Sequence, residues 1–122
     1  MPAGPDNHSN LHNAGLSKEE REAIAGIKVS LGRLLAGREF RMILFGSKAR
    51  GDYDGNSDID LAIIVEGLDR ELKIGIYDAV GDVELEHLLP VSTLVLSGED
   101  FRKLQARERR IAIDIENEGI PL

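Results

Sequence analysis

Hydrophobic residues recur at two different spacings along this chain, and the two spacings predict helices and strands in turn. Between residues 17 and 37 the spacing is three or four residues, which is typical of one buried helix face. Ser17 and Glu20 form a capping box at the start of this helix, and Gly37 is a typical stop signal. The apolar residues of the stripe are Ile24, Ile27, Leu31, Leu34 and Leu35.

Three segments have the composition of strands. Phe40–Phe45 is a mostly apolar run that ends at a glycine, and Ile59–Val65 is continuously apolar after Asp60. Both runs predict buried strands, and the second has the character of a central strand. Val91–Leu96 is rich in β-branched residues and predicts a third strand.

Two further helices are expected around these strands. Residues 69–89 carry apolar positions roughly on one face and end at Pro90, and a last helix is capped by Glu99 and Asp100 and ends near Gly119. The resulting order is α-β-β-α-β-α. It predicts an α/β (α+β) fold in which helices pack against a small mixed β-sheet.

The first 15 residues differ from the rest of the chain. They contain two Pro, two Gly and three Asn, with almost no large apolar residue. This composition predicts a disordered N-terminal tail over residues 1–15. The total length of 122 residues suits one domain, which we expect to occupy residues 16–122.

Charge and composition narrow the classes of function. The chain has 22 acidic and 15 basic residues, a net charge of −7, which disfavours direct binding to DNA or long RNA but not to a metal-bound nucleotide. It has no cysteine, which excludes disulfides and thiolate metal sites. No apolar run approaches the roughly 18 residues that span a bilayer, and no signal-peptide core is present. We therefore expect a cytoplasmic protein without a membrane interaction.

Candidate chemistry begins where the first predicted strand ends. Gly46 permits a tight turn and a close approach of a phosphate to the backbone. If residues 47–50 begin a helical turn, their N–H groups form an anion site, to which Ser47 adds a hydroxyl. Lys48 and Arg50 add positive charge. Gly46, Ser47, Lys48 and Arg50 are therefore the predicted nucleotide-binding residues.

Two aspartates open the second strand. Asp58 and Asp60 are two positions apart, so on a strand both project from the same face. Without a cation the carboxylates would repel each other, and a hard divalent ion removes that cost. The pair predicts a site for one or two Mg²⁺ ions, which can stabilise the reacting oxygens of a nucleotidyl transfer. The alternative is a solvent-facing strand start in which Ser57 or Asp58 only caps the turn.

Taken together, these motifs resemble a known signature. Gly46-Ser47, Arg50-Gly51 and Ser57-Asp58-x-Asp60-Leu61 are similar to the signature of the DNA polymerase β-like nucleotidyltransferases. The likeness is greatest to their minimal stand-alone branch, the minimal nucleotidyltransferases (MNT). The ending Ile113–Ile120 also resembles the closing helix of those proteins, which commonly ends in Glu-Gly-apolar.

The resemblance implies a specific activity. Asp58 and Asp60 would be the catalytic metal ligands, and Gly46 and Ser47 would hold the triphosphate. Arg50 would support either the phosphates or the turn. The reaction would move a nucleoside monophosphate, AMP from ATP, to a hydroxyl with release of pyrophosphate. Minimal nucleotidyltransferases are frequently encoded beside helical HEPN proteins as the antitoxin of a toxin–antitoxin pair. A HEPN-type protein is therefore the partner that the resemblance implies.

The chain departs from the family pattern on the third strand. Most active members supply a third carboxylate there, and the expected position holds Ser92, which is a poor Mg²⁺ ligand and no general base at neutral pH. Candidates to replace it are Glu84 and Glu86 before the strand, and Glu99 and Asp100 after it. The alternative function is a catalytically degenerate module that binds nucleotide or metal and neutralises its partner by association.

Overall fold

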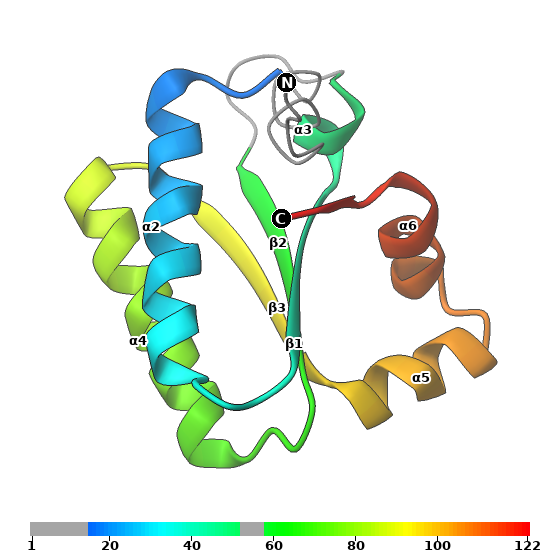
Figure 1. Ribbon diagram of the computed structural model, residues 1–122. Coiled ribbons are helices and arrows are strands. Elements are labelled where there is room, and N and C mark those ends of the chain that lie inside the picture. The colour runs from blue at the N-terminus through cyan, green and yellow to red at the C-terminus, as the bar shows by residue number, and fades with distance from the viewer. Residues whose placement is uncertain (1–14, 52–57) are drawn as a thin grey trace, which may run out of the picture.

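A four-stranded mixed sheet with helices on both faces forms the protein (Figure 1). The computed structural model describes residues 15–51 and 58–122, so the predicted tail lies outside the described residues except for Gly15. Strand β1 is antiparallel to β2 and to β4, and β2 is parallel to β3. The sheet order is β3-β2-β1-β4. The strands are β1 (Phe40–Phe45), β2 (Ile59–Val65), β3 (Val91–Ser97) and β4 (Ile120–Pro121). The predicted fold class is confirmed.

The helices divide between the two faces of this sheet. In Figure 1, α2 and α4 lie on the left of the strands, and α5 and α6 lie on the right. The short helix α3 follows β1 directly. The helices are α2 (Lys18–Leu34), α3 (Ser47–Arg50), α4 (Arg70–His87), α5 (Gly98–Ala106) and α6 (Arg110–Glu118). None of those in the described ranges has the length and apolar character needed to cross a membrane.

The sequence predicted the bounds of the first strands and the start of α2 correctly. β1 and β2 have the predicted bounds, and β3 runs one residue further. The capping box of α2 is present, because the Ser17 hydroxyl accepts from the Glu20 N–H at 3.1 Å and the Glu20 carboxylate accepts from the Ser17 N–H at 2.8 Å. The helix then ends at Leu34, before Gly37.

The expected single helix at the end of the chain is wrong, because two helices occupy this region. Ser97, and not the acidic pair after it, caps α5, and its hydroxyl accepts from the Asp100 N–H at 2.9 Å. The chain then turns between Ala106 and Arg110, where Glu108 has a left-handed φ of 52°. The corner lets α5 and α6 both pack on the same sheet face, which one straight helix could not do. The strand β4 after α6 was not predicted.

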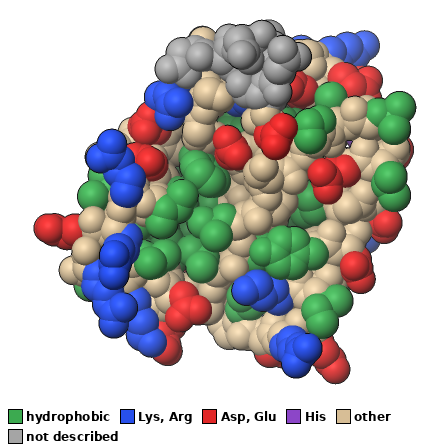
Figure 2. Space-filling view, turned by 180° about the vertical axis from the view of Figure 1, so that it is seen from behind, with side chains coloured by type: hydrophobic (Ala, Val, Ile, Leu, Met, Phe, Trp, Pro, Cys, Tyr) green, Lys and Arg blue, Asp and Glu red, His purple; other side chains and the backbone are tan. Residues whose placement is uncertain are grey.

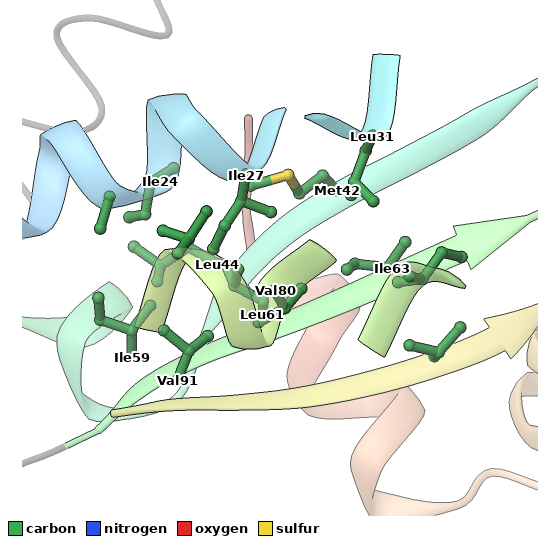
Figure 3. Close-up of a cluster of buried hydrophobic side chains, with 14 of the residues drawn as sticks. Ile24, Ile27, Leu31, Met42, Leu44, Ile59, Leu61, Ile63, Val80 and Val91 are labelled. Carbon is green, nitrogen blue, oxygen red and sulfur yellow. The ribbon is translucent and has the colours of Figure 1, made fainter. Parts of the chain in front are cut away.

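Two hydrophobic clusters lie on either side of the sheet. The larger joins the sheet to α2 and α4, and Figure 3 shows Leu31, Leu44 and Ile63 within it. The smaller joins the sheet to α5 and α6 through Phe101 and Ile115. On the face seen in Figure 2, hydrophobic side chains gather in the middle, and Lys and Arg side chains gather along the left side. Since β2 is buried on both faces, it is the central strand that the sequence predicted.

Candidate active site

Three strands bring polar side chains to one edge of the sheet. β1 ends at this edge, whereas the parallel strands β2 and β3 both begin there. The strand register pairs Asp60 with Ser92 on one side and with Phe45 on the other. Because side chains alternate along a strand, Asp58, Asp60 and Ser92 project from the sheet face that carries α5 and α6.

Gly46 brings the turn after β1 against the second aspartate. Its φ of 80° is in the left-handed region that favours glycine. A Cβ at this position would lie 2.3 Å from Oδ2 of Asp60, so a side chain would displace the carboxylate. The helical turn considered for residues 47–50 is present as α3, which closes with a hydrogen bond of 2.9 Å from the Gly51 N–H to the Ser47 carbonyl.

Ser92, the position at which the resemblance implies a third carboxylate, lies opposite Asp60 on the neighbouring strand. Its hydroxyl donates to Oδ2 of Asp58 at 3.2 Å, so the sequence alignment of this position with the two aspartates is correct. Burial raises the pKa of Asp60, and the negative charge of Asp58 raises it further, while Arg50 opposes both effects. Two negative charges are therefore only partly compensated at this edge.

The four other acids considered for the third position lie elsewhere. Glu84 accepts a hydrogen bond of 2.9 Å from the Val91 N–H and so holds the start of β3. Glu99 and Asp100 follow the far end of β3 and cannot reach the site. Glu86 is exposed on α4. Within residues 15–51 and 58–122, no three His, Cys, Asp or Glu side chains form a group that could hold a metal ion.

Lys48 points into the protein and binds α2. The residue is only 2% exposed, and its ammonium lies 2.6 Å from Oε2 of Glu20. Burial opposes ionisation of Glu20, but hydrogen bonds from Lys48 and Ser17 outweigh it and lower the pKa of this carboxyl. The described contact is thus structural, and a role of Lys48 in nucleotide binding stays a prediction.

Arg50 lies beside the acidic pair and contacts the end of α6. Its guanidinium donates to Oε2 of Glu118 at 3.1 Å, and its positive charge partly offsets the rise in the pKa of Asp60 that burial and Asp58 cause. Gly119 follows, and a Cβ there would lie 2.1 Å from the carbonyl oxygen of Ile115. The Glu-Gly pair therefore connects α6 both to the turn after β1 and to β4.

Sequence reasoning missed the roles of Glu20 and Glu118 next to this site. The capping box already accounts for a glutamate at position 20, so nothing in the sequence indicates its second contact, the ion pair with Lys48. Glu118 had a signal, the Glu-Gly ending, but spacing alone could not connect it with Arg50. Ser57 lies outside the described residues.

The donor atoms at this edge fit a hard divalent cation. Asp58 and Asp60 supply carboxylate oxygens on one face, which suit Mg²⁺ better than soft metals. The raised pKa of Asp60 points the same way, because a cation would relieve the repulsion between the two charges. The arrangement can therefore place a metal ion and an anionic ligand next to the Gly46 turn.

Comparisons with known proteins identify the family of this chain. Residues 24–120 match the family described as "Nucleotidyltransferase domain". Two proteins of Methanocaldococcus jannaschii, each named a "putative protein adenylyltransferase", are similar to this chain. One is 47% identical over 45 residues, which are 37% of this chain and 46% of the relative. The other is 35% identical over 77 residues, which are 63% of this chain and 61% of the relative. The matched region is thus less than two thirds of either relative.

A crystal structure of a "putative nucleotidyltransferase" from Sulfolobus solfataricus aligns with a TM-score of 0.47 and 21% identity, covering 84% of each chain. The family match extends from α2 to β4 and includes both the Gly46 turn and the two aspartates. The chain therefore belongs to the nucleotidyltransferase domain family.

Proposed function

We propose that this protein is a Mg²⁺-dependent nucleotidyltransferase that moves AMP from ATP to a hydroxyl of a partner protein. The observation that carries the proposal is the contact of the Gly46 turn with Asp60, with Asp58 on the same face of the sheet. Family membership supports nucleotidyl transfer. The names of the two archaeal relatives support a protein as the acceptor.

Each residue of the edge has a task in this proposal. Asp58 and Asp60 would hold Mg²⁺, which supplies positive charge to the triphosphate oxygens when it is bound. The Ser47 hydroxyl and the first N–H groups of α3 would bind the phosphates, because the first turn of a helix leaves such groups without intrahelical partners. Arg50 would add positive charge beside the transferred group.

The bond changes are those of a substitution at phosphorus. The acceptor oxygen bonds to the α-phosphorus, the bond from that phosphorus to the bridging oxygen breaks, and pyrophosphate leaves. The acceptor hydroxyl must also lose its proton. Ser92 cannot take it at neutral pH, so proton removal is the step for which the described residues offer least help.

Radiolabelled ATP tests the assignment directly. The protein, Mg²⁺ and ATP labelled at the α-phosphate are incubated with the product of the adjacent gene, and label is expected on that product. Asp58→Asn with Asp60→Asn should abolish it, whereas Glu99→Gln with Asp100→Asn removes the same charge from the opposite edge and should not. Label that persists in the first variant would contradict the proposed chemistry.

The second candidate is a module that neutralises a HEPN-type toxin partner by association, without turnover. The hydrogen bond between Ser92 and Asp58 favours it, because a serine occupies the position of the third carboxylate. Growth of cells that express the partner discriminates the two. If the variant with both aspartates replaced still protects the cells, association is sufficient, and if protection is lost, transfer is required.

A further inference from the structure

The side of α4 that faces away from the core carries a stripe of large hydrophobic residues. Ile76, Val80 and Val83 bury the inner side of this helix. The outer side exposes large hydrophobic residues at intervals of 3, 8 and 3 positions, which place them along one stripe. The stripe consists of Ile74, Tyr77, Leu85 and Leu88, which are 52%, 43%, 76% and 84% exposed. Within the described part of the chain, no other helix exposes as many large hydrophobic side chains.

A glycine interrupts this stripe in the middle. Gly81 lines an open hollow together with Tyr77, Leu85 and Leu88. Glycine weakens a helix interior relative to alanine, so an internal reason for it is expected. Gly75 has one, since a Cβ there would lie 3.2 Å from Leu34 of α2. At Gly81 a Cβ would meet nothing within 4 Å, so contacts within the described chain do not explain the residue. It leaves a notch that another backbone can approach closely.

One flank of the stripe is acidic, whereas Arg70 and Lys73 are exposed near the start of α4. Glu71, Asp78 and Asp82 are exposed at intervals of 7 and 4, which form a row along one flank. The charged residues that line the hollow are all acidic. A second copy that placed its own hollow against this one would bring acidic residues together, so like charges oppose self-pairing at the hollow. The complementary surface is an apolar ridge flanked by Lys or Arg.

We propose that the outer face of α4 is the docking groove for an amphipathic helix of another protein, with basic residues beside its apolar ridge. This groove consists of the stripe and the hollow at Gly81. It ends close to the candidate active site, because the carboxylate of Glu84 near its end accepts a hydrogen bond from the N–H of Val91, the neighbour of Ser92. Figure 1 shows the end of α4 at the same end of the sheet as the start of β2. Docking goes beyond the proposed transfer reaction, since it requires no catalysis.

A pair of synthetic peptides tests the groove. One carries Leu at helical i, i+3, i+4, i+7 spacing with Lys at the flanking positions, and the other has Glu in place of each Lys. Fluorescence anisotropy of the labelled peptides should show binding of the Lys peptide and none of the Glu peptide. Leu85→Ser with Leu88→Ser should weaken binding at least about tenfold. The control Ile113→Ser removes an exposed hydrophobic residue of α6 and should leave binding unchanged.

The notch has its own matched pair of variants. Gly81→Ala and Gly32→Ala both add a methyl group to open space on a helix, and both should raise the melting temperature. Only Gly81→Ala should weaken binding of the Lys peptide, because only this methyl group lies in the groove. Equal binding of the two variants would contradict the close approach of a partner backbone.

Three outcomes would overturn the proposal. They are no binding of the Lys peptide, equal binding of the Glu peptide, and no effect of the Leu85 and Leu88 replacements. Sedimentation velocity adds a fourth, namely a dimer that these replacements dissociate, since a second copy would then occupy the groove. The variant Asp58→Asn with Asp60→Asn should bind the Lys peptide as the parent does. Failure of docking is thereby separated from failure of the transfer reaction.

Discussion

Lys48→Met should destabilise the protein strongly, although the residue belongs to the loop that was predicted to bind nucleotide. Lys48 is 2% exposed and its ammonium lies 2.6 Å from the carboxylate of Glu20, which is itself only 8% exposed. Methionine has a similar length but leaves this carboxylate buried without its cation. Breaking a buried pair in this way costs about 3–5 kcal/mol. Since a domain of this kind has a total stability of about 5–15 kcal/mol, the loss is a large part of it.

Urea unfolding followed by circular dichroism measures this loss. Lys103→Met is the matched control, because its ion pair with Glu99 is exposed and should contribute no more than about 1 kcal/mol. Glu20→Gln keeps the capping hydrogen bond and strands the lysine instead. The double variant of Lys48 and Glu20 should lose less stability than the sum of the single losses, since neither charge is then left alone.

The same pair predicts a dependence on pH. The pKa of Glu20 is lowered in the folded protein, so its ionised form adds stability above the ordinary value of 4.5. That stability is lost as the pH falls through the lower folded value. The difference between the parent and Lys48→Met should therefore shrink in acid. If Lys48→Met instead keeps full stability at neutral pH and only weakens binding of Mg·ATP, the lysine is a ligand and the structural reasoning is refuted.

Three further variants test the edge of the sheet. Gly46→Ala should weaken Mg·ATP binding in calorimetry by at least about tenfold because its Cβ displaces Asp60, whereas Gly37→Ala, with the same φ of 80° and no neighbour within 4 Å, should cost about 1–2 kcal/mol of stability and leave binding intact. Without Mg²⁺, Ser92→Asp should lower the melting temperature, because it adds a third negative charge. Addition of Mg²⁺ should raise the melting temperature of this variant more than that of the parent, and the variant should transfer label faster. A melting temperature that does not respond to Mg²⁺ would contradict a metal at this edge. Because the pKa of Asp60 is raised, its ionisation destabilises the fold as the pH rises above 3.8. Asp60→Asn should thus be more stable than the parent at neutral pH without metal and should lose that advantage in acid. Urea unfolding at both pH values measures this difference, and a variant that is less stable than the parent at neutral pH would contradict the reasoning.

Features that depend on neighbouring residues were predictable from the sequence. The bounds of β1 and β2 follow from runs that must be buried, and the Gly46 turn and the aspartate pair are local motifs. The place of Ser92 was predictable too, because the strand register aligns it with Asp60 once β2 and β3 are parallel.

Contacts between distant segments were not predictable. Glu20 and Lys48 lie far apart in sequence, and each had a sufficient local explanation, as a capping residue and as a phosphate ligand. The corner at Glu108 is set by the need of two helices to cover one sheet face, which no spacing of apolar residues records. Two residues are too few for a strand signal, so β4 depends on its pairing with Ile43 and Leu44.

The contact of Arg50 with Glu118 also has a consequence for the order in which the site is assembled during synthesis. The two residues are 68 positions apart, and β4, which completes the sheet beside β1, follows Glu118. A nascent chain therefore contains the Gly46 turn and both aspartates long before it contains these contacts. Contacts of such long sequence separation are slow to form, because loop closure must precede them. The turn beside the aspartates thus leaves the ribosome early but gains its full set of contacts only after the residues of β4 have been made.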